Sequence, residues 1–207
     1  MLYALDLLGT FVFALSGAFK GRRYELDWLG ITVLAVLTGV GGGLIRDMLL
    51  GATPPAAFQD EWYFVACLLG AAVVIIAAPK IAKRWNRVML ADAVGLGLFA
   101  ALGAAKGAAH GLGPIGVVMM GALTATGGGV IRDILVGELP AILYKGFYAT
   151  AAIIGAIMFV GIDAAGASES IALGAAAIIC SALRFYALVK NVNLPKAERV
   201  PEVTSPK

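Results

Sequence analysis

Seven long apolar runs alternate with short polar segments along the chain. Each run is close to the roughly 20 residues that an α-helix needs to cross the hydrocarbon of a bilayer. The predicted spans are residues 2–19, 29–50, 61–79, 88–105, 114–136, 147–162 and 170–189. The connections between them are short, so we expect a single membrane domain over residues 1–207. Residues 191–207 are polar and hold three prolines, which predicts a disordered tail.

The composition agrees with an integral membrane protein. Of the 207 residues, 60% are hydrophobic and only 14% are charged, and the mean hydropathy is +0.90. Soluble domains contain about 25% charged residues. The first apolar run lacks a basic segment before it, so we expect no separate signal peptide. The net charge of +3 is modest, and we expect no nucleic-acid partner.

One heptad occurs twice, 86 residues apart. Gly41-Gly42-Gly43-Leu44-Ile45-Arg46-Asp47 and Gly127-Gly128-Gly129-Val130-Ile131-Arg132-Asp133 differ only by Leu against Val. Each glycine costs roughly 1 kcal/mol relative to alanine inside a helix. An Arg-Asp pair is also costly in hydrocarbon. The duplication of such a string indicates that it has a specific role.

The repeat extends well beyond the heptads. Residues 6–54 match residues 92–140 at 21 of 49 positions without a gap. Residues 2–80 and 88–162 therefore form two repeats of three spans, and residues 170–189 form a seventh helix without a mate. Three is an odd number, so the second repeat enters the membrane from the opposite side. The predicted fold is an all-α polytopic membrane protein with an inverted-topology repeat.

The lysines and arginines of the loops predict the orientation. Twelve of them fall on one side if the spans alternate: Lys20, Arg22, Arg23, Lys80, Lys83, Arg84, Arg87, Lys145, Lys190, Lys196, Arg199 and Lys207. The other side receives only Lys106. Because positive charge favours the cytoplasmic side, we expect the N-terminus outside and the C-terminus in the cytoplasm.

The glycine triplets fall near the bilayer midplane in spans 2 and 5. Two interpretations are open. The triplets Gly41–Gly43 and Gly127–Gly129 can break these helices and shape a pore or binding site between the repeats. Alternatively, they give smooth faces for tight helix packing. The symmetry of the two triplets and the charges after them favour the pore, and we expect spans 2 and 5 to be broken there.

Intramembrane charges usually pair with one another. Asp6 and Arg46 both fall in the outer half of the membrane, and Asp92 and Arg132 both fall in the inner half. We therefore predict two symmetry-related ion pairs, Asp6–Arg46 and Asp92–Arg132. Further candidates for lining a path are Asp47, Asp133, Ser16, Thr38, Thr124, Thr126, Phe13, Phe99 and Lys106.

Each of these candidates also has a structural interpretation. The hydroxyls of Ser16, Thr38, Thr124 and Thr126 can face a cation or bond a backbone carbonyl, and the second use is commoner. Phe13 and Phe99 can form a constriction or pack in the core. Lys106 can simply extend to the interface. The lone histidine, His110, has no cluster of ligands near it, and no metal site, catalytic residue or nucleotide-binding motif is apparent.

The doubled GGG-x-Ile-Arg-Asp heptads, set in two three-span repeats plus a seventh helix, resemble the prokaryotic branch of the TRIC family of trimeric intracellular cation channels. This branch overlaps bacterial proteins described by a "glycine transporter" domain. The resemblance covers about residues 2–190. It implies a homotrimer with one hourglass-shaped pore per subunit, lined by the second and fifth spans kinked at the triplets. It also implies passage of potassium, and of sodium, across the cell (inner) membrane.

Two functions follow, and neither is enzymatic. The first is a passive cation channel, in which the aspartates neutralise the two arginines. The second is an alternating-access transporter for a small zwitterion such as glycine, because inverted repeats are at least as typical of transporters. No cofactor is expected in either case. The expected partners are monovalent cations, membrane lipids, which include a bound lipid as a candidate ligand, and further copies of the chain.

Overall fold

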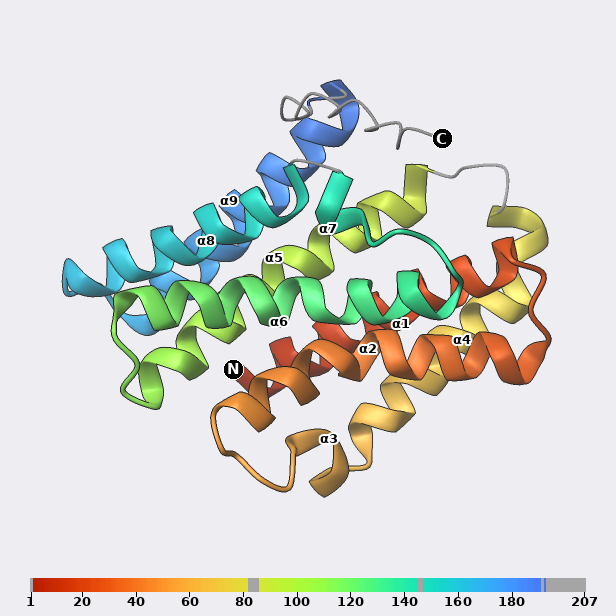
Figure 1. The fold of residues 1–207 in the computed structure, drawn as a ribbon, viewed down its shortest axis with the longest axis horizontal. Helices are drawn as coiled ribbons and strands as arrows, with labels where there is room; N and C mark the ends of the chain where they lie inside the picture. The colour runs from red at the N-terminus through yellow and green to blue at the C-terminus, as the bar shows by residue number, and fades with distance from the viewer. Residues whose placement is uncertain (1, 82–85, 145–146, 191, 193–207) are drawn as a thin grey trace, which may run out of the picture.

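The computed structural model describes residues 2–81, 86–144, 147–190 and 192, with side chains of 77–90 not described. Its helices are α1 (Leu2–Arg23), α2 (Trp28–Leu49), α3 (Ala56–Gln59), α4 (Trp62–Ile81), α5 (Asn86–Ala109), α6 (Pro114–Leu135), α7 (Ala141–Tyr144), α8 (Phe147–Ala164) and α9 (Glu169–Lys190). The described residues contain no strand, so the all-α prediction is confirmed. Figure 1 shows the arrangement of these helices.

Each of the seven predicted spans coincides with one long helix. Six of these helices are long and apolar enough to cross a membrane. In the remaining one, α4, the apolar stretch Trp62–Ile76 is shorter. The predicted boundaries differ from the observed ones by a few residues, because polar residues such as Lys20 and Arg23 continue the helix beyond the apolar run. The disordered tail is predicted for residues 191–207, which lie outside the described residues apart from position 192. The loop cations Lys83, Arg84 and Lys145 also lie outside them.

Local signals explain where the helices α2 and α6 begin and end. Asp27 precedes α2, and its carboxylate accepts a hydrogen bond of 2.6 Å from the Gly30 amide. Pro114 opens α6, where its missing N–H costs nothing. Gly51 and Gly137 follow the two helices with φ of +71° each, a conformation that glycine adopts without strain. The two helices therefore begin with different signals but end in the same way, at the same offset of 86 residues.

Two short helices were not predicted. α3 follows Pro54 and Pro55, and α7 follows Pro140. Four apolar-rich residues are too few for a periodic pattern, so only the prolines marked these positions. α3 lies directly after α2 and α7 lies directly after α6, and both short helices contribute to the charged site described below.

α1 and α5 lie at the centre of the molecule. α1 packs on α2, α4 and α5, and α5 packs on α6, α8 and α9. Two apolar cores result, one shared by α1, α2 and α4 and the other by α5, α6, α8 and α9. Phe13 of α1 belongs to the second core and meets Phe99 of α5 with ring centroids 5.1 Å apart. The predicted pair of symmetric aromatic residues therefore packs at the junction of the two cores.

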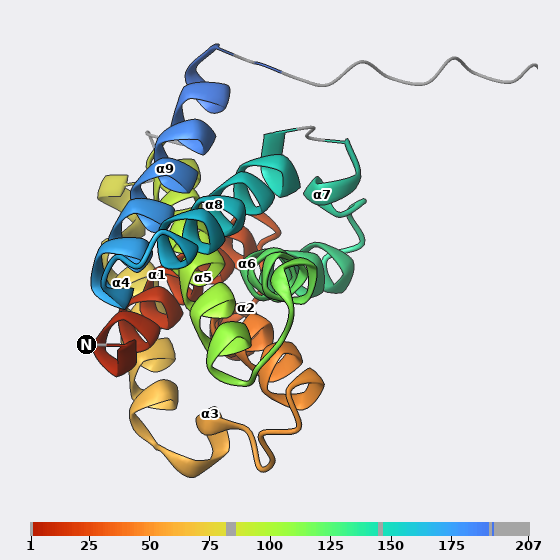
Figure 2. The same ribbon diagram turned by 90° about the vertical axis from the view of Figure 1, so that its left-hand side faces the viewer.

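α2 and α6 lie side by side, as Figures 1 and 2 show from two directions. Both helices are continuous through their glycine triplets, so the expectation that they break there is wrong for this structure. The physical reason is that the glycines have no side chains, so α2 and α6 can pack closely against each other while both helices stay continuous. This is the packing interpretation of the triplets.

Candidate functional site

The glycine triplets form the contact between α2 and α6. A Cβ atom added to Gly42 would lie 2.1 Å from the carbonyl oxygen of Thr124, and one added to Gly128 would lie 2.3 Å from that of Thr38. Real Cβ contacts are never this short, so only glycine fits at either position. Backbone therefore meets backbone at this crossing.

The two contacts are reciprocal. Gly128 and Thr124 stand 86 residues after Gly42 and Thr38. The glycine of each repeat therefore contacts the threonine carbonyl of the other repeat. Such reciprocity is what a local two-fold axis produces. Gly42 of α2 meets Thr124 of α6, and Thr38 meets Gly128, so residue numbers increase in opposite directions along the two helices. The helices are therefore antiparallel. Arg46 follows Gly42 by one helical turn and Arg132 follows Gly128 by one helical turn, so the two arginines lie on opposite sides of the crossing.

Arg46 lies in the first of two ion networks, the Arg46 network, which consists of Asp6, Arg46, Asp47 and Lys106. The Arg46 guanidinium donates to Asp47 at 2.8 Å and to Asp6 at 3.1 Å. The Lys106 ammonium lies 3.4 Å from Asp6 and 3.6 Å from Asp47. Arg46 and the two aspartates are buried, and all of their charges are compensated within the network.

The second network, the Arg132 network, consists of Lys20, Asp92, Arg132, Asp133 and Glu138. Arg132 donates to Asp92 at 2.9 Å and to Asp133 at 3.0 Å. The Lys20 ammonium lies 3.2 Å from Asp133 and 2.5 Å from Glu138. The ion pairs Asp6–Arg46 and Asp92–Arg132, predicted from membrane depth, are thus both present. The contacts of the two lysines with the aspartates of the opposite repeat were not predicted.

Asp47 and Asp133 each have a second, structural contact. The other carboxylate oxygen of Asp47 accepts the Ala56 amide at 3.0 Å, and that of Asp133 accepts the Ala141 amide at 2.9 Å. These amides open the short helices α3 and α7. Each aspartate therefore fixes an arginine on one side and a following short helix on the other.

The threonine hydroxyls bond to their own helices. Thr38 donates to Leu34 at 2.6 Å, Thr124 donates to Met120 at 2.6 Å, and Thr126 donates to Ala122 at 2.8 Å, all through backbone carbonyls. Ser16 differs, because its hydroxyl accepts from Arg132 at 2.6 Å and donates to Asp92 at 3.2 Å. Ser16 is therefore part of the charged site, whereas the threonines contribute mainly to helix packing.

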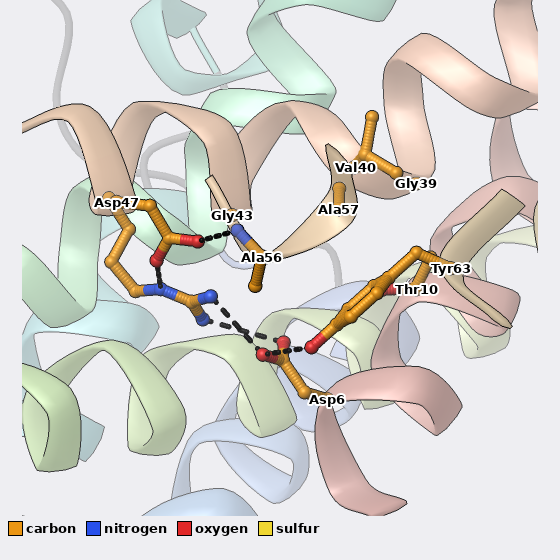
Figure 3. A pocket seen from close by; sticks show the side chains of 10 residues that line it. Asp6, Thr10, Gly39, Val40, Gly43, Asp47, Ala56, Ala57 and Tyr63 are labelled. Atoms are coloured by element: carbon orange, nitrogen blue, oxygen red, sulfur yellow. Dashed lines mark hydrogen bonds and ion pairs between the residues drawn. The ribbon is translucent and has the colours of Figure 1, made fainter. Parts of the chain in front are cut away.

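A small cavity adjoins the Arg46 network (Figure 3). Asp6, Arg46 and Asp47 line it together with Tyr63 of α4, whose hydroxyl donates to Asp6 at 3.1 Å. It has room for about one water molecule. Gly43 also lines this cavity, whereas at Gly129 the hydroxyl of Tyr148 stands 2.8 Å from where a Cβ atom would lie. The two sides of the crossing are therefore not identical.

Sequence reasoning missed several residues of this site. Tyr63 and Tyr148 stand 85 residues apart, just outside the ungapped repeat, and the shifted offset concealed them. Lys20 was interpreted as a loop cation. Glu138 has no charged counterpart in the first repeat, so the symmetry argument did not select it. Arg184 is buried in α9, 4.8 Å from the Tyr148 ring, and a charge within a predicted span was the available signal.

Two side chains at the loop end of the Arg132 network, Glu138 and Tyr24, have pKa values that differ from their ordinary ones. Hydrogen bonds from the Lys20 ammonium and the Tyr24 hydroxyl lower the pKa of Glu138. The same contact raises the pKa of the Tyr24 phenol, because ionised tyrosine would face the Glu138 carboxylate. Glu138 is therefore ionised at neutral pH. Among the residues that the structure describes, no group of three potential metal ligands occurs.

Comparison with known proteins agrees with this geometry. The family model described as "Glycine transporter" matches the chain over residues 3–79 and again over residues 89–164. A UPF0126 membrane protein of Deinococcus radiodurans is 45% identical over 157 residues, which cover 75% of this chain and 73% of that protein. The inner membrane protein YadS of Escherichia coli K12 is 41% identical over 160 residues, 76% and 77% of the two chains.

A solved structure extends the likeness to the whole fold. The TRIC trimeric intracellular cation channel orthologue from Rhodobacter sphaeroides superposes with a TM-score of 0.88 at 41% identity, covering 92% of this chain and 98% of that one. The chain belongs to the prokaryotic TRIC family. The resemblance seen in the heptads is thereby confirmed. TRIC family members are membrane transport proteins and not enzymes, and this chain is a multi-pass membrane protein.

Proposed function

We propose that this protein is a channel for monovalent cations, potassium and also sodium, with one path per subunit between α2 and α6. The single observation that supports it most is the compensation of both central arginines. Arg46 and Arg132 each contact two carboxylates, so their charges do not repel a cation as a free arginine would. The solved relative named above is a cation channel, and the same function is inferred for this chain.

In this proposal the glycine crossing is the narrowest point of the path. The backbones of α2 and α6 touch at Gly42 and Gly128, so the conformation described corresponds to a closed path. Conduction requires the two helices to separate there, which exposes the carbonyls of Thr38 and Thr124 to a passing ion. Carbonyl oxygens are suitable ligands for a partly dehydrated cation.

The assembly and the orientation are part of the proposal. We infer a homotrimer in the cell membrane, in contact with lipids, with the N-terminus outside and the C-terminus in the cytoplasm. Light scattering of the purified protein should give three times 21.2 kDa after subtraction of detergent. For orientation, Glu25→Cys and Ala165→Cys place thiols in opposite loops, and a membrane-impermeant thiol reagent should label only Ala165→Cys in intact cells.

A second candidate is a transporter of a small zwitterion such as glycine. The observation in its favour is that Arg46, Asp6 and Asp47 line one cavity, which offers both charges to an amino acid. Against it, this cavity has room for about one water molecule, which is less than glycine needs. Binding of glycine would therefore require a wider conformation than the one described.

Single-channel recording of the purified protein in planar bilayers separates the two functions. With a potassium chloride gradient, a channel gives unitary currents that reverse near the equilibrium potential of potassium. Proteoliposomes from the same preparation are tested for uptake of radiolabelled glycine. Saturable glycine uptake without unitary currents would overturn the channel and support the transporter.

A further inference from the structure

The two ion networks match residue by residue except at one position. Four charged residues of each network stand 86 residues apart, namely Asp6 with Asp92, Lys20 with Lys106, Arg46 with Arg132, and Asp47 with Asp133. Glu138 is the exception, because Ala52 occupies the corresponding place. The Arg46 network therefore has a formal charge of zero, and the Arg132 network has a formal charge of −1.

The backbone at these two positions is the same. The amide of Ala52 donates to the carbonyl of Asp47 at 2.9 Å, and the amide of Glu138 donates to that of Asp133 at 2.9 Å. Each follows a glycine with φ of +71°. Both residues are half-buried. At these two positions the difference is therefore confined to one side chain, which makes Ala52 a matched position for testing Glu138.

The carboxylate of Glu138 lies at the loop end of its network. It contacts the Lys20 ammonium at 2.5 Å and accepts a hydrogen bond from the Tyr24 hydroxyl. Its side chain is 27% exposed, whereas that of Asp133 behind it is 2% exposed. An ion that arrives from the side of the α6–α7 loop therefore meets the Glu138 carboxylate before that of Asp133.

We infer that Glu138 increases the rate at which cations enter the path from the α6–α7 side, and so makes conduction unequal in the two directions. The inference rests on the channel proposed above. A fixed charge near a narrow entrance raises the local concentration of counter-ions and hence their rate of entry. The effect is strongly screened at 1 M salt, where the Debye length is about 3 Å, against about 10 Å at 0.1 M.

The experiment uses the full chain in inside-out patches from giant Escherichia coli spheroplasts, where every channel has its native orientation. Current–voltage curves are recorded in symmetric 0.1 M and 1 M potassium chloride for the wild type, Glu138→Ala and Glu138→Gln. At 0.1 M we expect both substitutions to reduce the unitary current about twofold in one voltage direction, with little change in the other. At 1 M the curves should converge.

The matched variant is Ala52→Glu, which adds a carboxylate at the corresponding place of the Arg46 network. It should increase the current in the voltage direction opposite to the one that Glu138→Ala reduces. Because Ala52→Glu adds a charge and removes no charged side chain, it tests the inference even if Glu138→Ala folds poorly. Equal changes in both directions, or changes that persist at 1 M, would overturn the role of Glu138. Absence of any unitary current in the wild type would instead overturn the channel itself.

Discussion

The Lys20 ammonium of α1 lies 3.2 Å from the Asp133 carboxylate of α6, and this ion pair joins the two halves of the protein. Its counterpart joins Lys106 of α5 to Asp47 of α2 at 3.6 Å. Each half therefore supplies a lysine to the network of the other half. Neither network is complete within one repeat, so the charged site exists only when the two repeats are assembled.

Substitution of Gly42 by alanine should destabilise the protein. The added Cβ would lie 2.1 Å from a backbone carbonyl, which cannot rotate away as a side chain can. We expect a loss of about 1–3 kcal/mol, the usual range for overpacking. Gly128→Ala should cost a similar amount, because it makes the reciprocal contact at 2.3 Å. Thermal unfolding of the purified variants in detergent measures both.

The control for this prediction is a helical glycine with free space around it. A Cβ atom added to Gly161 of α8 or Gly174 of α9 would meet nothing within 4 Å. Gly161→Ala and Gly174→Ala should therefore be neutral or stabilise by up to about 1 kcal/mol, since alanine is the better helix former. If Gly42→Ala were as well tolerated as these two, the close crossing of α2 and α6 would be wrong.

Replacing Arg132 and Asp92 together should cost less than the sum of replacing each of them alone. Removing one member of a buried ion pair leaves an uncompensated charge, at about 3–5 kcal/mol. Asp92→Asn and Arg132→Gln should each be strongly destabilising. Their combination should lose less than the sum, with a coupling energy of about 0.5–3 kcal/mol. Additive losses in the double-mutant cycle would show that the two side chains do not interact.

Much of this arrangement followed from the sequence because a repeat constrains depth. Asp6 and Arg46 were paired by their expected depth in the membrane, and the structure places them 3.1 Å apart. The seven long helices followed from the apolar runs, because the thickness of the bilayer fixes the length of a membrane-spanning helix. Features that depend on hydrophobic length or on the duplicated motif were thus accessible without coordinates.

Features that depend on the direction of a side chain were not accessible. Three glycines predict either a break or a close packing face, and only the position of the Thr124 carbonyl against Gly42 decides between them. Lys20 reads as a loop cation because nothing in its surroundings indicates that it reaches Asp133. Glu138 was missed for the opposite reason, because it lacks the symmetry by which the other charges were found.

Stability should decrease at low pH in part through Glu138. Its pKa is lowered in the folded protein, so its contribution is present above the unfolded value of about 4.3 and is lost as the pH falls through the folded value. The difference in melting temperature between the wild type and Glu138→Gln should therefore be largest near pH 7 and shrink below pH of about 4. A difference that stayed constant down to pH of about 3 would mean that Glu138 gains nothing from its contacts.

Two equivalent tyrosines should respond differently to removal of their hydroxyl groups. The Tyr63 hydroxyl donates to Asp6 at 3.1 Å, so Tyr63→Phe should cost about 1–3 kcal/mol, as expected for a hydrogen bond to a charged group. The Tyr148 hydroxyl is buried and has no hydrogen-bond partner among the described residues. Tyr148→Phe keeps the ring under Arg184 and should be neutral or slightly stabilising.

The difference between the two tyrosines can also be tested by substituting the glycines near them. Gly129→Ala brings a Cβ atom to 2.8 Å from the Tyr148 hydroxyl, whereas at Gly43 the nearest atom, on Arg46, is 3.5 Å away. Gly129→Ala should therefore be the more destabilising, and Tyr148→Phe should rescue it by removing the oxygen. Thermal unfolding of the single and double variants measures this rescue. If Tyr148→Phe destabilised as much as Tyr63→Phe, the Tyr148 hydroxyl would have a partner such as a buried water, and the two ends of the site would be more alike than their contacts indicate.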